Sequence, residues 1–133
     1  DESIRKIDYN VLKENFLAAG HFANNAVLVN TERNKNGLPS LQRNLQLDAR
    51  ACDIAKRVAK DQQPVTITDL GNLKRGPTIR VIHASMMENE KERSNILNPY
   101  ITEFGMGTAK GIDGMLYLCQ LFAKAQVLVC SDL

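Results

Sequence analysis

The sequence has little net charge, few histidines and no long apolar run. Its 17 basic and 15 acidic residues leave a formal net charge of +2, and the basic residues are scattered, so nucleic-acid binding is not indicated. The longest apolar stretch, residues 125–130, has the length of a strand, whereas a membrane-spanning helix needs roughly 20 residues. A zinc site of the usual kind needs three or four converging ligands, and His21 and His83 are the only histidines.

Cysteine is scarce as well. The three cysteines, Cys52, Cys119 and Cys130, are too few for a disulfide scaffold, and their odd number leaves at least one thiol unpaired within the chain. Two alternatives stand: a Cys119–Cys130 bridge with Cys52 as a small buried hydrophobe, or three reduced cysteines. The chain starts at Asp1 and has no glycosylation sequon. Either a leader has been removed or the chain is a trimmed fragment.

The residues that are present predict one globular domain, 1–133. The chain is 133 residues long and 44% apolar, with mixed charges; two domains of half this length would each have a marginal core. Apolar residues spaced by three and four predict a helix over residues 9–34, in which Gly20 marks a candidate break. The stripe predicted to face inward consists of Leu12, Phe16, Ala19, Ala23 and Ala26 or Val27.

Two further helices are predicted in the middle of the chain. The first covers residues 45–60 with Asn44 as its N-cap, and the second covers residues 78–91. The stretch 62–78 between them is rich in proline and glycine and is the least regular, with residues 65–68 as a candidate short strand.

The last third changes to the alternating pattern of strands. Residues 104–109 and 115–122 predict two strands joined by a turn at Asp113-Gly114, and residues 127–129 predict a last strand. Helices followed by an antiparallel meander indicate an α+β fold with helices packed on the sheet.

Three blocks of sequence, taken in order, resemble the CAP superfamily of cysteine-rich secretory, antigen-five and pathogenesis-related-one proteins, in its short bacterial or fungal form. The first block is Asn30-Thr31-Glu32-Arg33 with Gly37-Leu38-Pro39-Ser40-Leu41 and the helix after it. The second is Gly71-Asn72-Leu73 with its following helix. The third, residues 93–122, is the most specific. The resemblance covers about residues 27–122, leaves 1–26 as an N-terminal helical extension, and implies an α/β/α sandwich.

The resemblance also implies a cleft with two histidines and two acidic residues that binds a divalent metal in several relatives. The segment expected to carry the first histidine, residues 61–71, has none. Gly71 stands at one acidic position and Asn89 at the other, while Glu92 replaces the second histidine. The site is therefore predicted to be degenerate, with no metal, no cofactor and no catalytic residues.

The remaining polar candidates have structural explanations. His83 and His21 are predicted to be surface or capping residues, and Glu88, Glu90 and Glu92 to form a solvated helix end, because residues two apart on a helix do not face one another. Asn95 and Asn98 are predicted to hold the turn before the sheet. The pair Gly105 and Gly107 indicates a close approach of the strand to a helix.

Three hypotheses for function follow. The first is a secreted, non-catalytic CAP-like domain that binds a protein partner, or a lipid or sterol as some relatives do. The second is a hydrolase that uses Glu92 with His83. The third is an assembly module in which the N-terminal helix packs on another copy of the chain.

Overall fold

The structure is a computed structural model that describes residues 2–62, 65–67 and 70–125. Within these residues the chain forms four helices, α1 (Glu2–Lys35), α2 (Leu45–Asp61), α3 (Ile79–Glu88) and α4 (Glu90–Ile96). The strands are β1 (Gln42–Arg43), β2 (Leu70–Gly76), β3 (Glu103–Lys110) and β4 (Leu116–Ala123). Every helix in this part of the chain is too short or too polar to cross a bilayer.

The strands form one mixed sheet in the order β1-β3-β4-β2. The predicted hairpin is confirmed: β3 and β4 pair antiparallel, with Gly107 opposite Cys119. Strand β2, which precedes α3 and α4 in the chain, pairs antiparallel with the other edge of β4, whereas β1 is parallel to β3. The predicted strand over residues 127–129 lies outside the described residues.

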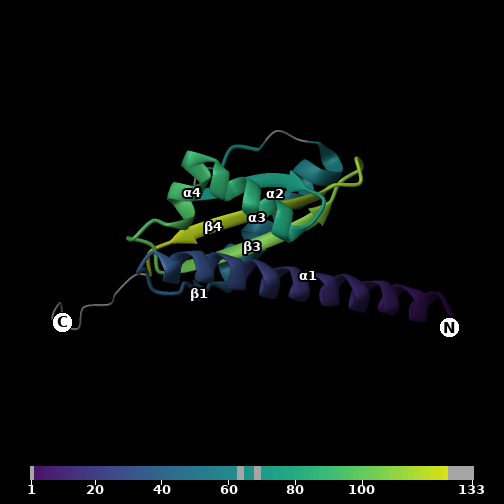
Figure 1. The fold of residues 1–133 in the computed structure, drawn as a ribbon. Coiled ribbons are helices and arrows are strands. Elements are labelled where there is room, and N and C mark those ends of the chain that lie inside the picture. The colour runs from purple at the N-terminus through teal and green to yellow at the C-terminus, as the bar shows by residue number, and fades with distance from the viewer. Residues whose placement is uncertain (1, 63–64, 68–69, 126–133) are drawn as a thin grey trace, which may run out of the picture.

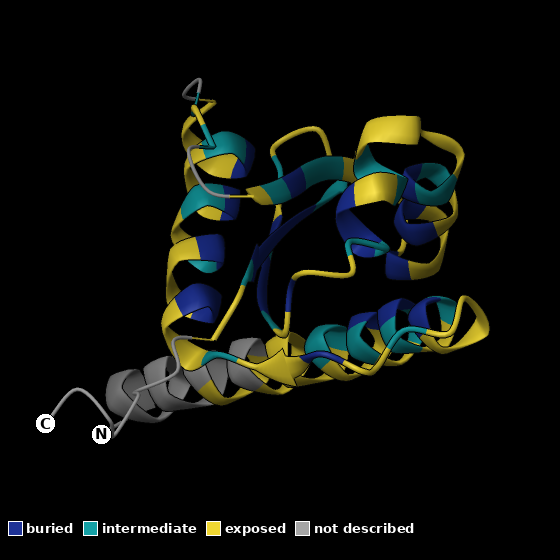
Figure 2. Ribbon diagram, turned by 90° about the vertical axis from the view of Figure 1, so that its left-hand side faces the viewer, coloured by how far each residue is buried: buried dark blue, intermediate teal, exposed yellow. Residues whose placement is uncertain are grey.

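The sheet separates two helical layers (Figures 1 and 2). Helix α2 covers one face, where Leu47, Ala51 and Ala55 pack on Cys119 and Leu121. Helices α1, α3 and α4 cover the other face around a second apolar cluster of Val29, Leu41, Ile79, Ile82, Met86, Ile96, Ile101, Phe104, Met106, Leu118 and Phe122. The predicted α+β fold with an α/β/α sandwich is confirmed.

Helix α2 forms as its sequence predicts. The side chain of Asn44 accepts hydrogen bonds from the backbone N–H groups of Gln46 and Leu47, which otherwise have no intrahelical partner. Its small buried residues let β3 come close. A Cβ on Gly105 would lie 2.3 Å from Asp48 N, and one on Gly107 would lie 2.2 Å from Cys52 N, so both positions require glycine.

The structure corrects the prediction for the N-terminal helix. Helix α1 begins at Glu2, and Gly20 does not break it. The stripe predicted to face inward faces solvent instead: Leu12, Phe16 and Val27 are 68%, 79% and 64% exposed. The buried face of α1 combines the polar residues Asn25 and Arg33 with Val29, and of the predicted stripe Ala26 alone packs against the core. Apolar spacing therefore pointed to the wrong side of the helix.

The middle of the chain needs two further corrections. Strand β2 runs through residues 70–76, which the sequence indicated as irregular, and residues 65–67 of the predicted short strand are not a strand. The helix predicted over 78–91 ends at Glu88. Asn89 has an extended backbone and accepts a hydrogen bond from Glu92 N, which starts α4 as a separate helix.

Candidate functional site

A pocket of about 410 Å³ lies between β2 and α4, and we call it the β2–α4 pocket. It is lined by Val65, Ile67, Leu70, Gly71, Asn72, Leu73, Lys91, Glu92 and Asn95. Two positions where the family resemblance expects metal ligands, Gly71 and Glu92, are therefore part of one pocket. Its size is within the range of small-molecule sites.

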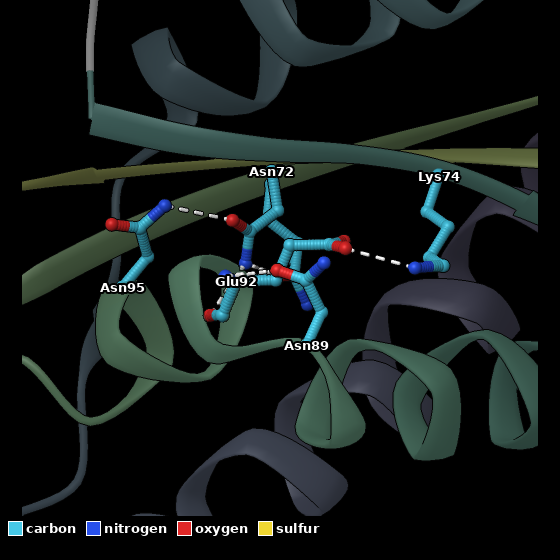
Figure 3. Close-up of polar contacts among 6 residues, drawn as sticks. Asn72, Lys74, Asn89, Glu92 and Asn95 are labelled. Carbon is cyan, nitrogen blue, oxygen red and sulfur yellow. Dashed lines mark hydrogen bonds and ion pairs between the residues drawn. The ribbon is translucent and has the colours of Figure 1, made fainter.

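Strand alternation decides which β2 side chains reach α4. Asn72 and Lys74 point to the α4 side of the sheet and contact Glu92, as Figure 3 shows. Gly71 has the opposite orientation, because a Cβ built there would meet Leu121 and Ile67. Consecutive residues of a strand face opposite sides of a sheet, so Gly71 contributes backbone rather than a side chain to the pocket.

A chain of buried amides forms the polar floor of this region. Gln120 Nε2 donates to Asn25 Oδ1 at 3.0 Å, and Asn72 Nδ2 donates to Gln120 Oε1 at 3.1 Å. Asn95 Nδ2 in turn donates to Asn72 Oδ1 at 2.8 Å. These four residues are at most 9% exposed. The chain connects α1, β4, β2 and α4, and it orients Asn72 and Asn95 at the pocket wall.

Glu92 has a different environment from the one predicted. Its side chain is 15% exposed, and its Oε1 lies 2.8 Å from Lys74 Nζ. The prediction of a solvated helix end is wrong for Glu92, because β2 covers it and supplies a cation. The Glu92 carboxylate is therefore already paired with the Lys74 ammonium group. Its Oε2 atom is buried and has no hydrogen-bond partner among the described residues.

Two further positions at which the resemblance expects acidic ligands, Gly71 and Asn89, carry no acidic side chain. Asn89 is exposed and uses its side-chain oxygen to cap α4 at Glu92 N, 3.0 Å away. A side chain at position 71 would place its Cβ 2.6 Å from the backbone oxygen of Gln120. At these two positions the described residues therefore offer no carboxylate or imidazole to the divalent metal that the resemblance implies. Over the described residues, no three His, Cys, Asp or Glu side chains gather where they could hold a metal ion.

His83 lies in the interior, which corrects the prediction of a surface or capping residue. It is 5% exposed on α3, and Nε2 is 4.0 Å from Glu32 Oε1 on α1. Burial lowers the pKa of His83, and the nearby Glu32 carboxylate opposes that shift. Neither ring nitrogen has a hydrogen-bond partner in the described part of the chain.

His21 and the proposed Glu92–His83 pair are also placed by the structure. His21 is half-buried, and its Nδ1 lies 2.9 Å from Thr108 Oγ1; burial lowers its pKa. His83 contacts α1 while Glu92 contacts β2, and His83 does not line the β2–α4 pocket. Glu92 and His83 therefore do not share the pocket that the hydrolase hypothesis requires.

The remaining candidate residues hold turns and packing. Asn95 Nδ2 donates to Gly71 O at 3.2 Å as well as to Asn72, so it fastens α4 to β2. Asn98 Oδ1 accepts from Tyr100 N at 2.8 Å, which forms the turn before β3. In the β3–β4 turn, Asp113 Oδ1 accepts from Met115 N at 3.0 Å and Gly114 has a φ of +81°.

Asp113 also has charged and phenolic partners. Its Oδ2 lies 2.9 Å from Arg75 Nη1 and accepts from the Tyr117 hydroxyl at 2.8 Å. The hydrogen bond from Met115 N, followed by those from Tyr117 and Arg75, lowers the pKa of Asp113. These contacts fasten the hairpin turn to β2.

Cys52 and Cys119 carry free thiols; Cys130, and with it the candidate Cys119–Cys130 bridge, lies outside the described residues. Burial, with a smaller contribution from Cys52, raises the pKa of Cys119 to about 12. A thiol with so high a pKa is not a nucleophile at neutral pH.

Sequence reasoning missed several residues that shape the site. Lys74 pairs with Glu92, Gln120 and Asn25 extend the amide chain, and Arg33 is fully buried. Gln120 carried a signal, because it is a polar residue inside an otherwise apolar strand. The partner of Lys74 could not be identified without the pairing of β2 with β4.

Comparisons place this geometry among known folds. No family model and no curated protein sequence matches the chain. Solved structures do match. An outer surface protein of Borrelia burgdorferi is 13% identical, with a TM-score of 0.69 over 80% of this chain and 94% of that one.

Two bacterial structures are similar over part of their own length. An extracellular protein from Bacillus anthracis that contains an SCP domain is 18% identical, with a TM-score of 0.59 over 81% of this chain and 41% of that one. A cysteine-rich secretory protein of Staphylococcus aureus is 19% identical, with a TM-score of 0.57 over 81% of this chain and 39% of that one. The chain has the fold of the CAP superfamily.

Proposed function

We propose that the chain is a secreted CAP-like domain that acts by binding rather than by catalysis, with its ligand in the β2–α4 pocket. One observation carries this proposal: the pocket contains two positions at which the family resemblance expects metal ligands, Gly71 and Glu92, and the Glu92 carboxylate is paired with Lys74 instead. Secretion is supported by the structural neighbours, whose names describe outer-surface, extracellular and secretory proteins.

The lining of the pocket supports an amphipathic ligand such as a lipid or sterol. Val65 is half-buried and Leu70 is 37% exposed on the Asn72 side of β2, so both offer apolar surface to a ligand, whereas Ile67 and Leu73 pack toward α2. Asn72 and Asn95 add hydrogen-bonding groups, while Lys91 and Glu92 add charge at the edge. Pockets of this kind bury an apolar body and orient it by a few polar contacts. The runner-up ligand is an apolar side chain of a partner protein.

Titration with metals tests the loss of the site. We expect no stoichiometric heat with Zn²⁺ or Mg²⁺ in calorimetry, because a site of three or four ligands is needed. The variant Glu92→Ala serves as the control, since any weak binding that it retains comes from elsewhere on the surface. Tight one-to-one binding that Glu92→Ala abolishes would show that the site still holds a metal.

Titration with palmitate and with cholesterol, followed by amide chemical shifts, tests the ligand class. We expect saturable shifts at β2 and α4 that Leu70→Asp weakens at least tenfold, because a charge would then replace part of the apolar surface. Ile112→Asp is the matched control: Ile112 is 71% exposed in the β3–β4 turn. Shifts that Ile112→Asp removes equally would contradict a site at this pocket, and no shifts with either probe would favour the protein partner.

A further inference from the structure

The exposed face of α1 carries an apolar stripe that nothing in the described chain covers. It consists of Leu12, Phe16, Ala19, Ala23 and Val27, all exposed. Their spacings of three and four residues place them on one side of the helix. Figure 1 shows the N-terminal end of α1 extending beyond the sheet and the other helices, while the rest of the helix lies alongside the sheet.

The sizes of these side chains are self-complementary in the antiparallel direction. When two copies of α1 are placed antiparallel about the Ala19–Gly20 pair, Leu12 of one copy lies opposite Val27 of the other. Phe16 then lies opposite Ala23. Phe16 thus meets a small residue, Leu12 meets a shorter branched one, and Ala19 and Gly20 meet at the crossing point. A Cβ on Gly20 would have nothing within 4 Å, so there is room for a second helix to come close.

A pocket lies at the Val27 end of the stripe. It has a volume of about 450 Å³, lies between α1, the start of α3 and β4, and has Val27, Leu28, Ile79 and Leu116 among its lining residues. In the antiparallel arrangement, Leu12 of one copy reaches Val27 of the other, at the edge of this pocket. The two pockets of a symmetric pair would each receive the same side chain, as a two-fold interface requires.

We propose that the exposed stripe of α1 is a homodimer interface, in which two copies pack their N-terminal helices antiparallel. Side chains of this size and exposure would bury roughly 500 Å² per copy, and the total of about 1,000 Å² is near the lower limit for a specific interface. This proposal does not depend on the β2–α4 pocket.

Sedimentation equilibrium tests the association. We expect the mass to rise from the 14.8 kDa of one chain toward twice that value with increasing concentration. Phe16→Asp should weaken the dimer more than about 100-fold, because a buried aromatic contact is lost twice in a symmetric pair. Ala23→Asp, on the facing position, should do the same, whereas Leu45→Asp, at a 70% exposed site on α2, should have no effect.

Cysteine cross-linking tests the antiparallel direction, in a background with Cys52 and Cys130 replaced by serine. We expect a mixture of Leu12→Cys and Val27→Cys chains to cross-link, and Leu12→Cys alone not to. A chain that stays monomeric at 500 µM would overturn the proposal. So would a dimer that survives both Phe16→Asp and Ala23→Asp, efficient cross-linking of Leu12→Cys to itself, or a monomer that binds lipid vesicles through α1.

Discussion

The face of the sheet covered by α2 packs mostly small apolar residues around two leucines, whereas the face covered by α1, α3 and α4 holds six of the seven buried polar side chains of the described residues. On the α2 face, Gly105 and Gly107 bring the strand backbone against the helix. On the opposite face, an amide chain, a histidine and an arginine lie among the apolar side chains. The first face depends on steric fit and the second on hydrogen bonds among buried polar groups, several of which keep an atom without a partner in the described residues.

The difference shows where this fold can change. Small residues in tight contact leave no volume for new side chains, so the α2 face acts as a scaffold. The polar face contains the β2–α4 pocket, beside which Lys74 and Asn72 contact Glu92 while Asn95 contacts Asn72. Replacing one polar side chain there changes hydrogen-bond partners without changing the packing of the sheet.

Among substitutions on the polar face, we expect replacement of Arg33 to lower the free energy of unfolding most. The arginine is fully buried and donates to three backbone oxygens, of Pro39, Ile96 and Asn98, at 2.8–2.9 Å, and burial lowers its pKa. Arg33→Met leaves these carbonyls without their donor, at about 1–3 kcal/mol for each buried group. We expect a loss of about 4 kcal/mol in the free energy of unfolding, measured by urea denaturation.

Arg57→Met is the matched control for Arg33. Arg57 is 54% exposed and pairs with Asp53 on the surface of α2 at 3.0 Å. An exposed pair of this kind contributes at most about 0.5 kcal/mol. Equal losses for the two variants would mean that the hydrogen bonds of Arg33 do not stabilise the polar face.

Substitution of Gly107 tests how much the close packing of β3 against α2 contributes to stability. The Cβ of Gly107→Ala would lie 2.2 Å from Cys52 N, so α2 must move away from β3. We expect a loss of about 3 kcal/mol, at the upper end of the usual cost of overpacking, measured by urea denaturation at low micromolar concentration. Gly20→Ala is the control: the added Cβ meets nothing, and the change should stabilise α1 by up to about 1 kcal/mol. A neutral Gly107→Ala would show that this contact can relax.

The same contrast explains what the sequence could predict. Helix α2, the β3–β4 hairpin and the close approach at Gly105 and Gly107 follow from local patterns of spacing, capping and glycine. The polar face does not, because its contacts join residues far apart in sequence: Asn25 with Gln120, and Lys74 with Glu92. The buried side of α1 was misjudged for this reason, since Asn25 and Arg33 are buried there through partners on other elements.

The free energy of unfolding at mildly acidic pH tests whether the buried His83 is neutral in the folded protein. A histidine whose pKa is lower in the folded protein binds a proton more readily in the unfolded chain. Its contribution to stability is therefore complete above the unfolded pKa of about 6.5 and is lost as the pH falls below that value. We expect the free energy of unfolding to fall between pH 7.5 and 5.5, by at most about 1.4 kcal/mol for each pH unit below 6.5.

Two variants assign this pH dependence to its residue. His83→Met keeps an apolar side chain of similar length in the interior and should remove most of the slope, because no group titrates there. His21→Gln should leave most of it, since His21 is only half-buried and already has Thr108 as a hydrogen-bond partner. An unchanged slope in His83→Met would mean that the buried histidine is protonated equally in both states. In that case the Glu32 carboxylate, 4.0 Å away, would offset its burial completely.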